Sequence, residues 1–453
     1  MNVLEVQGLT KRYPAFTLNG VSFDVPQGAV MGFIGRNGAG KSTTLKSILG
    51  MVHPDAGAVK VFGMDYAENE RAIRRELGVV LGGIDFYPKK KIKTITDVTR
   101  RFYNNWDEEK HRHYLELFHI DESKRVDQLS SGMKVKYMIA LALSHNARLL
   151  ILDEPTSGLD PVSRDELTEL LRRVVADGRA ACCSLLTSPP IWRSVPPTLP
   201  LSRTASCNIP VLWTISAPTT RTWALRWRIS SCTWKGGRWM KTLLYKQLRL
   251  VCHPMTPVFC LFGFMVIIPN YPYTVIFFYV MLGLFFTFLN MREQKDLYYT
   301  ALLPVPKRDA VKAGCLFTAL IELLSLAVLV PCALLAVRLQ PGKDNLVGLD
   351  PNLALFAAGF LLYAVFNAVF LPSFYANGYK VGVAFVKAII PTTLAMIVFE
   401  ALPHVPGLMW LDDMDAATQV RLLPVLIGSI LIYVGCMALT FQASARAYEK
   451  VDM

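Results

Sequence analysis

Cysteine is missing from the first 181 residues, and all nine cysteines of the chain fall at or after Cys182. Five of them lie in or beside long apolar runs, and none has the spacing of a paired metal-binding motif. We therefore expect neither a disulfide scaffold nor a cysteine-ligated metal site. A signal peptide is not expected either, because Met1 leads directly into a strand-like run.

Acidic residues are missing from a second region. Between Cys182 and Trp239 there is no Asp or Glu, although the stretch carries six Arg, one Lys and six Trp. No helical or strand periodicity is visible in it. It contributes +7 to the formal net charge of +13. The other basic residues lie largely beside apolar runs, which argues against nucleic-acid binding.

The first motif that is present reads G-R-N-G-A-G-K-S at residues 35–42, directly after an apolar, strand-like run at residues 29–34. Glycines let backbone N–H groups surround phosphates, Lys41 adds a point charge, and the Ser42 hydroxyl suits Mg²⁺. The pattern predicts a phosphate-binding loop between a strand and a helix. Some unrelated glycine loops share it, so further motifs decide the class.

A second motif is a continuous apolar run at residues 149–152 that ends at Asp153 and Glu154. Such a run predicts a strand buried in a parallel sheet, and these sheets bind ligands at the carboxyl ends of their strands. Asp153 suits a metal ion and Glu154 suits a water molecule. A structural role for Glu154 is the alternative, which the neighbouring Asp153 disfavours.

A third motif, L-S-S-G-M at residues 129–133, opens a predicted helix over residues 134–144, and S-G-L-D follows at residues 157–160. Over about residues 2–179, with all spacings in order, the three motifs resemble the ATP-binding cassette (ABC) transporters. L-S-S-G-M is similar to the family's LSGGQ signature, and S-G-L-D to its D-loop. The resemblance implies an α/β P-loop NTPase fold that uses ATP and Mg²⁺.

The resemblance also implies the residues of the site. Glu154 is the expected catalytic residue, and Ser42 and Asp153 are the expected metal ligands. Tyr13 stands where the family stacks an aromatic ring on adenine, although an ordinary half-buried aromatic at a strand end is an equal alternative. The expected nucleotide-binding residues are Tyr13, Gly35, Asn37, Gly38, Gly40, Lys41, Ser42, Thr43, Ser130, Gly132 and Asp160.

Such cassettes pair head to tail, so the resemblance implies a homodimer or a pair with a second ABC half-transporter. Each ATP then lies between one partner's Lys41 loop and the other partner's helix start at Ser130 and Gly132. A helix N-terminus suits a γ-phosphate because its free N–H groups and its dipole favour anions. Glu154 is expected to orient or deprotonate the attacking water.

Two positions depart from the family. The glutamine expected after the strand-like residues 78–81 is replaced by Gly82-Gly83. The nearby Asp85 can approach the metal or remain a solvated loop carboxylate. The histidine expected after the next strand is absent, because no histidine lies between His145 and His253.

A shifted reading frame explains both the missing histidine and the unusual stretch. If each true codon starts one base earlier, the run from Cys182 permits V-L-F-S-T-H, a strand followed by a histidine. We hypothesise that one base is lost near codons 178–181 and that Met240 begins a separate permease gene. A genuine single chain with a degenerate or disordered linker is the alternative.

The expected domains are 1–181, an ATP-binding domain that lacks its last strand and switch histidine; 182–239, an anomalous linker; and 240–453, a transmembrane permease. A membrane-spanning helix needs roughly twenty apolar residues. Six spans are expected, at about residues 255–269, 272–290, 315–337, 353–373, 381–400 and 422–442. The first is short and contains Pro257, so it is tilted, re-entrant or joined to the second.

Lys and Arg cluster in alternate loops, which predicts a multi-pass plasma-membrane protein with the cassette and both termini in the cytoplasm. The loop at residues 292–312 resembles the cytoplasmic segment of type-2 ABC exporter permeases. Its part near Tyr298 is expected to contact the cassette near Gly82. A basic amphipathic segment lying on anionic membrane lipid is the alternative.

Three carboxylates mark the spans: Glu322 lies inside the third, and Glu293 and Glu400 lie at span ends. An ionisable group inside a span often has a functional role. We expect Glu322 to act in substrate contact or conformational coupling, or else to make a polar packing contact. Glu293 and Glu400 are expected to be interfacial.

The sequence thus predicts an α/β P-loop cassette followed by an all-α polytopic membrane domain. The function expected is ATP-driven export of a peptide, lipid or drug-like substrate from a bacterium. The alternative is an ATP-binding membrane protein that arises from a frameshift fusion and transports nothing.

Overall fold

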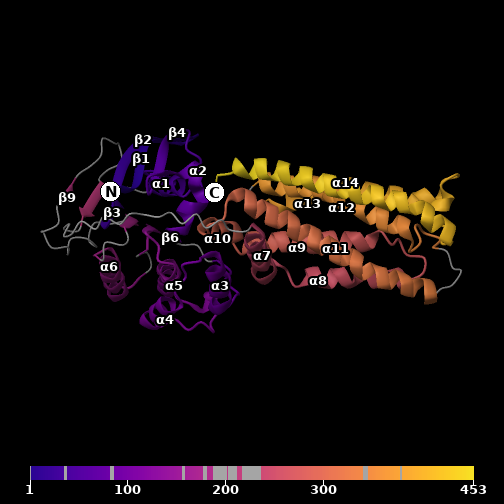
Figure 1. Ribbon diagram of the computed structural model, residues 1–453, viewed down its shortest axis with the longest axis horizontal. Helices are drawn as coiled ribbons and strands as arrows, with labels where there is room; N and C mark the ends of the chain where they lie inside the picture. The colour runs from indigo at the N-terminus through magenta and orange to yellow at the C-terminus, as the bar shows by residue number, and fades with distance from the viewer. Residues whose placement is uncertain are drawn as a thin grey trace. The chain divides into compact units, whose positions relative to one another are not determined.

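The computed structural model describes residues 2–34, 38–81, 86–155, 159–176, 181–186, 201–202, 212–216, 236–339, 345–377 and 380–452. They form two compact units. The first comprises Met1–Thr242 together with Lys295–Pro306 and Asp452–Met453, and the second comprises Leu243–Gln294 and Lys307–Val451. The first is an α/β unit and the second a bundle of long helices (Figure 1), which confirms the predicted fold class.

Two β-sheets make up the strands of the first unit. An antiparallel sheet has the order β2-β1-β4-β5, formed by β1 (Asn2–Tyr13), β2 (Phe16–Pro26), β4 (Ala56–Val61) and β5 (Met64–Asp65). The other has the order β6-β7-β8-β3-β10-β9, formed by β3 (Ala29–Ile34), β6 (Leu77–Leu81), β7 (Leu149–Asp153), β8 (Ala181–Leu186), β9 (Leu201–Ser202) and β10 (Leu212–Ser216). Strands β6, β7, β8 and β3 are parallel, and β10 and β9 are antiparallel.

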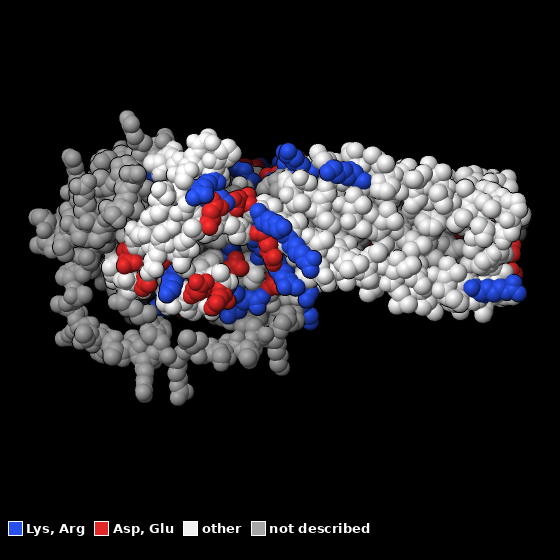
Figure 2. Space-filling model, turned by 90° about the horizontal axis from the view of Figure 1, so that it is seen from above, with Lys and Arg blue, Asp and Glu red and all other residues white. Residues whose placement is uncertain are grey.

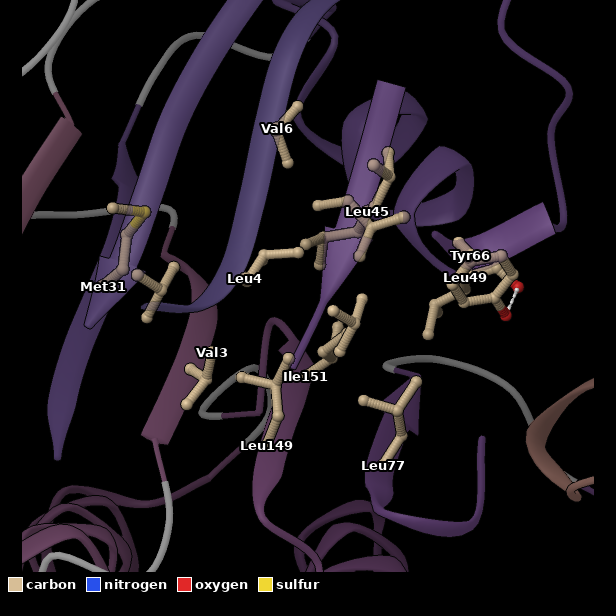
Figure 3. Close-up of a cluster of buried hydrophobic side chains, with 14 of the residues drawn as sticks. Val3, Leu4, Val6, Met31, Leu45, Leu49, Tyr66, Leu77, Leu149 and Ile151 are labelled. Carbon is tan, nitrogen blue, oxygen red and sulfur yellow. Dashed lines mark hydrogen bonds between the residues drawn. The ribbon is translucent and has the colours of Figure 1, made fainter. Parts of the chain in front are cut away.

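The buried core of the first unit joins both sheets to helices α1 (Lys41–Ile48) and α2 (Tyr66–Arg75). Figure 3 shows its side chains converging from β1, β3, β6, β7 and both helices. Tyr66 donates a hydrogen bond of 2.8 Å to the Leu49 carbonyl and so pins α2 beside α1. Residues 149–152 of β7 are all buried, as expected for a parallel strand that is covered on both faces.

Strand β8 lies in the middle of the parallel sheet, paired with β7 on one side and β3 on the other. The prediction that the cassette lacks this strand is therefore wrong. The run A-C-C-S-L-L at residues 181–186 is apolar enough for a central strand of a parallel sheet. Strand β10 also comes from the anomalous stretch, although most of residues 187–235 lies outside the described part of the chain.

A group of helices accompanies the β6 side of this sheet: α3 (Ile92–Thr99), α4 (Glu108–Leu117) and α5 (Ser131–Ser144) (Figure 1). Helix α5 packs closely on β6 at Gly78. A Cβ at Gly78 would lie 2.6 Å from the Leu150 side chain and 3.0 Å from Ala142. Glycine is thus required for the close packing of α5 on the strand.

Among the described residues, five helices of the second unit are long and apolar enough to cross a membrane: α9 (Val275–Glu293), α11 (Lys307–Leu339), α12 (Leu353–Ala376), α13 with its short extension (Val381–His404) and α14 (Ala416–Glu449). Figure 2 shows that the visible face of this bundle is nearly free of charged side chains between its ends. Five of the six expected spans are confirmed as apolar helices of sufficient length.

The first expected span differs from the other five. Residues Trp239–Val251 and Met255–Ile267 form two helices bent by 100° at the break between them. Pro254 lies in this break and Pro257 in the second helix, and proline removes a backbone donor and clashes with the preceding helical turn. The first expected span, at about residues 255–269, thus corresponds to the second helix of a bent pair, which has the form of a broken span or of a re-entrant loop.

Glu400, at the end of α13, joins two other segments of the helical unit through hydrogen bonds to its carboxylate. Its carboxylate accepts backbone hydrogen bonds from Thr274 (2.8 Å) and Leu349 (3.1 Å). Thr274 is the N-cap of α9, where free N–H groups and the helix dipole favour a negative charge. A Cβ at Gly348 would lie 1.7 Å from the Glu400 Oε2 atom, so the carboxylate fits only beside a glycine.

Candidate nucleotide-binding site

The described part of the phosphate-loop motif is a tight turn into α1. Gly40 is the N-cap of α1 and has a left-handed φ of 88°. A Cβ on Gly40 would lie 2.8 Å from the side chains of both Leu18 and Phe16. Gly38 also has a positive φ of 83°, whereas Gly35 and Asn37 lie outside the described residues. Glycine is thus required at Gly40 for two independent reasons, backbone conformation and space.

The first turn of α1 contains three further predicted site residues. The Lys41 side chain is 6% exposed, while Ser42 is exposed and Thr43 is half-buried. Ser42 precedes Thr44, whose N–H and hydroxyl both donate to the Gly40 carbonyl at 2.9 and 3.0 Å. The hydroxyl of Ser42 is left facing outward at the N-terminus of a helix.

The acidic pair lies at the carboxyl end of β7. Both side chains are half-buried, and Asp153 is paired with Leu81 of the neighbouring strand β6. Burial and the adjacent Glu154 raise the pKa of Asp153, whereas Lys46 and Lys41 lower it. Asp153 therefore lies within electrostatic reach of the lysine of the phosphate loop.

Glu154 has a left-handed backbone with a φ of 47°. A non-glycine residue in this region is uncommon and costs about 1 to 3 kcal/mol unless its surroundings hold it there. Such conformations cluster at sites where a side chain must be aimed. The two carboxylates are adjacent in sequence, but only Glu154 of the pair has this left-handed backbone.

The signature residues form a second group at the starts of α5 and α6 (Pro161–Ala176). Ser130 is the N-cap of α5, and its hydroxyl accepts a hydrogen bond of 3.2 Å from the Met133 N–H. A Cβ on Gly132 would lie 2.7 Å from the Leu159 side chain. Asp160 accepts a hydrogen bond of 2.9 Å from the Ser163 N–H, and hydrogen bonds from Ser163 lower the pKa of this carboxylate.

Tyr13 ends strand β1 and is 36% exposed. Burial raises the pKa of its hydroxyl, and a hydrogen bond with Thr43 opposes the rise. The Lys11 ammonium lies 5.6 Å from the centre of the ring. The ring thus stands beside the first turn of α1 with part of its surface open to a ligand.

These residues fit a magnesium ion in their chemistry. The Ser42 hydroxyl and the Asp153 carboxylate are oxygen donors, which Mg²⁺ prefers, and the ion usually completes its coordination with water and substrate phosphate. The described residues contain no cluster of three or more His, Cys, Asp or Glu able to hold a metal ion. The two protein ligands expected here, Ser42 and Asp153, do not form such a cluster.

Helix α10 (Asp296–Leu302) belongs to the same compact unit, although it lies far along the chain. The Asp296 side chain is buried and accepts hydrogen bonds from the hydroxyls of Tyr87 and Thr300. The Tyr299 hydroxyl lies 2.6 Å from Thr99 Oγ1, and its ring packs edge-on against Tyr87 with 5.0 Å between centres.

Arg74 of α2 holds the other end of α10 by donating to the Ala301 carbonyl at 2.6 Å. The predicted contact region near Gly82 is itself outside the described residues, but Phe86 and Tyr87 follow it directly. Tyr298, the residue named from the sequence, packs half-buried against the core. Asp296 and Tyr299 were missed; a usable signal was the D-L-Y-Y run inside an otherwise basic loop.

The first unit contains a strand and helix joined by a phosphate-loop motif, an acidic pair at the carboxyl end of β7 in the same sheet, and a capped signature helix. These features define a P-loop nucleotide-binding domain. The chain continues from this domain into a helical membrane unit. Residues 18–157 match the family model described as ABC transporter. Residues 242–449 match the model described as ABC-2 family transporter protein. The chain therefore combines a cassette of the ABC transporter family with an ABC-2 family membrane domain.

Curated relatives resemble the cassette. The Bacitracin transport ATP-binding protein BcrA of Bacillus licheniformis is 32% identical over 178 residues, which cover 39% of this chain and 58% of that protein. The Nod factor export ATP-binding protein I of Burkholderia lata is 35% identical over 182 residues, which cover 39% and 60%. The chain thus spans less than two thirds of each relative.

Among solved structures, one described as the ATP binding subunit of an ABC transporter is 31% identical, with a TM-score of 0.37. The match covers 40% of this chain and 79% of that one.

Proposed function

We propose that this protein is an ATP-hydrolysing exporter in which the cassette drives the membrane helices. The observation that carries the proposal is the acidic pair at the end of β7, which lies within electrostatic reach of Lys41 in the phosphate loop. One carboxylate beside a phosphate-binding lysine suits a metal ion, and the adjacent Glu154 suits a water. This is the arrangement that phosphoryl transfer to water requires.

In the proposed reaction ATP is the substrate and water is the nucleophile. Glu154 orients the water or accepts its proton, and Lys41 offsets the negative charge of the transferring phosphoryl group. Mg²⁺, held by Ser42 and Asp153, supplies Lewis-acid stabilisation of the phosphate oxygens when bound. Tyr13 stacks on the adenine. Among the described residues, the remaining phosphate contacts come from backbone N–H groups of residues 38–43.

The signature group acts, in this proposal, on the ATP of a partner cassette. Ser130 and Gly132 lie in the first turn of α5 and Asp160 caps α6, and helix starts favour anions. The partner is a second copy of this chain or another ABC half-transporter. ATP then shifts the pair towards a closed state only by its differential affinity for the two states.

Helix α10 transmits closure in this proposal. It is continuous in sequence with α9 through Gln294 and with α11 through Pro306, while its buried Asp296 and Tyr299 are bonded to Tyr87 and Thr99. A movement of α3 or of the loop at Tyr87 therefore pulls directly on the chain that leads into two long apolar helices.

We further propose a bacterial plasma-membrane location, with lipid around the apolar helices and the cassette and both termini in the cytoplasm. Basic residues next to α9 and α11, such as Arg292, Lys307 and Arg308, support this orientation. Bacitracin and Nod factor, named for the relatives, support a peptide, lipid or drug-like cargo. The domain limit at residue 239 remains part of the proposal, to be tested by limited proteolysis, whereas the expected limit at residue 181 falls at the start of β8.

The test is ATP hydrolysis by the full chain reconstituted in lipid vesicles. Glu154→Gln keeps the size of the side chain but removes the base, so we expect hydrolysis to fall roughly 10²- to 10⁴-fold while ATP still binds. Glu116→Gln, which changes an exposed carboxylate on α4, is the matched control. If the unaltered chain binds ATP without turnover, the exporter is rejected in favour of a non-transporting ATP-binding protein.

A further inference from the structure

A buried polar cluster joins three of the membrane helices. Glu322, near the middle of α11, is 0% exposed. Its carboxyl oxygens lie 2.9 and 3.0 Å from Asn367 Nδ2 of α12, and the Tyr433 hydroxyl of α14 lies 2.6 Å from Oε2. These three side chains connect all three helices, α11, α12 and α14, through direct polar contacts.

A second layer supports the cluster. The Ser325 hydroxyl donates to the Glu322 backbone carbonyl at 2.7 Å and lies 2.7 Å from the Tyr363 hydroxyl. Because Ser325 uses its own hydrogen on that carbonyl, Tyr363 must donate to Ser325. Hydrogen bonds therefore hold the side chains of the cluster in fixed rotamers, both at the Glu322 carboxyl group and at its backbone carbonyl.

In the part of the chain that the structure describes, no Lys, Arg or His pairs with the carboxyl group of Glu322. The groups bonded to Glu322 are neutral, and the titratable side chains that face it are Cys315 on α11, Tyr363 on α12 and Tyr433 on α14, with Cys260 of α8 next to Tyr363. None of these carries a positive charge. A buried carboxylate without a cationic partner costs several kcal/mol in an apolar medium, and the cost is relieved by a counter-ion or by neutralisation.

A second observation favours neutralisation of the Glu322 carboxyl group over a counter-ion. Asn367 is fully buried, and its Oδ1 atom has no hydrogen-bond donor. Turning the amide by half a rotation exchanges Oδ1 with Nδ2 and places the oxygen within about 3 Å of the carboxyl group. A carboxyl that carries a hydrogen on Oε1 then donates to Asn367, while Tyr433 continues to donate to Oε2. One added proton thus gives the Asn367 oxygen a donor, while the amide N–H₂ takes the former position of the oxygen and gives up its 3.4 Å contact with Met437 Sδ.

We propose that Glu322 is a proton-binding site, and that the membrane domain takes up and releases one proton at this residue as α14 moves against α11 and α12. The inference rests on the proposed transport function. In the packed state the Oε1–H bond is present and donates to Asn367. When Tyr433 withdraws and water enters, that bond breaks, the proton passes to water, and the hydrated carboxylate remains. Closing the helices reverses the exchange, so no other reactant is consumed.

The direct test is infrared difference spectroscopy of the nucleotide-free full chain in vesicles, comparing the unaltered protein with Glu322→Gln at neutral pH. We expect the carbonyl stretch of a neutral carboxyl group that disappears in the variant. Spectra that lack this band overturn the proposal, because Glu322 is then ionised while packed. If E322Q does not fold, Tyr433→Phe serves instead: the band must shift when the hydroxyl donor is removed, and an unchanged spectrum also overturns it.

The release step is tested by the pH profile of vesicle-bound ATP hydrolysis. We expect E322Q to lower the rate of ATP hydrolysis roughly tenfold or more. The part of the pH dependence that is due to residue 322 should disappear in E322Q and remain in Glu322→Asp, which keeps a carboxyl group. Glu293→Gln, at the end of α9, is the control and leaves the profile unchanged. An E322Q profile that matches the unaltered chain rejects proton release. If the unaltered chain does not hydrolyse ATP, the exporter fails, while the infrared result still decides whether Glu322 binds a proton.

Discussion

The Tyr299 hydroxyl donates to Thr99 Oγ1 across 2.6 Å, because the Thr99 hydroxyl itself donates to the Ile95 carbonyl at 2.8 Å. Both side chains are buried. This pair ties α10 to α3 although the residues are 200 positions apart. It is a direct hydrogen-bonded link between the cassette fold and the chain leading to the membrane helices.

Removing either half of this pair tests that link. Tyr299→Phe removes the hydrogen bond between the two side chains, and Thr99→Val removes both that bond and the bond to the Ile95 carbonyl. Each lost bond is expected to cost about 1 kcal/mol in the free energy of unfolding. The double variant is expected to cost less than the sum, because the two changes remove the same interaction. Thermal melting of the full chain in detergent measures this, with Thr94→Val on α3 as control. Strict additivity contradicts the link.

Gly40→Ala is expected to abolish ATP binding. The new Cβ meets Leu18 and Phe16 at 2.8 Å, and the residue needs a φ of +88°. Gly20→Ala is the matched control, since it has a positive φ of 64° but open space around its Cβ. Both variants carry backbone strain of about 1 kcal/mol, so only the steric clash separates them. Equal loss of ATP binding in both variants contradicts the clash.

Asp153→Asn is expected to stabilise the nucleotide-free protein while removing its response to Mg²⁺. Burial and Glu154 raise the pKa of Asp153. Between its unfolded and its folded pKa the native state holds more protons than the unfolded state, so stability falls as pH rises through that window. The uncharged amide of Asn does not lose stability in this way, because it does not ionise. Melting curves at neutral pH, with and without Mg²⁺ and ATP, check both effects.

Asp165→Asn changes an exposed carboxylate on α6 and serves as the control for Asp153→Asn. It should leave both the melting temperature and the shift produced by Mg²⁺ and ATP unchanged. An Asp153→Asn variant that keeps the full shift excludes Asp153 as a metal ligand.

Gly348→Ala is expected to destabilise the helical unit. Its Cβ would occupy the position of the Glu400 carboxylate, 1.7 Å from Oε2, and displacing that carboxylate leaves the N–H groups of Thr274 and Leu349 without their acceptor. A buried unsatisfied donor costs about 1 to 3 kcal/mol. Gly382→Ala meets no atom within 4 Å and should be neutral. Equal melting temperatures for the two variants count against this role of Glu400.

Acid is expected to weaken the cassette through His145. Burial lowers the pKa of this histidine from 6.5 to about 3, and its ring is stacked on Tyr103 with 3.9 Å between centres. The unfolded chain binds the proton first, so stability is complete above about pH 6.5 and falls as pH drops towards 3, by about 1.4 kcal/mol per pH unit. His145→Phe keeps the stacking and should flatten this loss. His113→Phe, at an exposed position, should not.

The sequence predicted those helices and strands that are determined by residues close together in the chain. The apolar runs at 29–34 and 149–152 became β3 and β7, and the helix expected at 134–144 became α5, which starts earlier because Ser130 caps it. The long span around 315–337 became α11, extended at its start because Lys307 and the polar residues after it continue the helix.

What the sequence did not predict depends on partners far along the chain. The D-L-Y-Y run marks the segment around Asp296 as unusual, but it does not predict the burial of this carboxylate, because the partner Tyr87 lies 209 residues away. The need for glycine at Gly348 likewise comes from Glu400, on another helix. The missing strand was misjudged for a different reason: β8 has no alternating pattern, since a strand covered on both faces needs only a short apolar run.

Strand β8 acts as a spacer. It separates β7, which ends in the carboxylates, from β3, which leads to the phosphate loop, and two strand spacings amount to about 10 Å. This gap is set by backbone hydrogen bonding rather than by any particular side chain. The hypothetical shifted frame permits V-L-F-S here, which is also a largely apolar run, so the same gap is expected from that product. Point substitutions within β8 should therefore be tolerated far better than its deletion, which would bring β7 one strand closer to β3 and leave too little room for a phosphate between them.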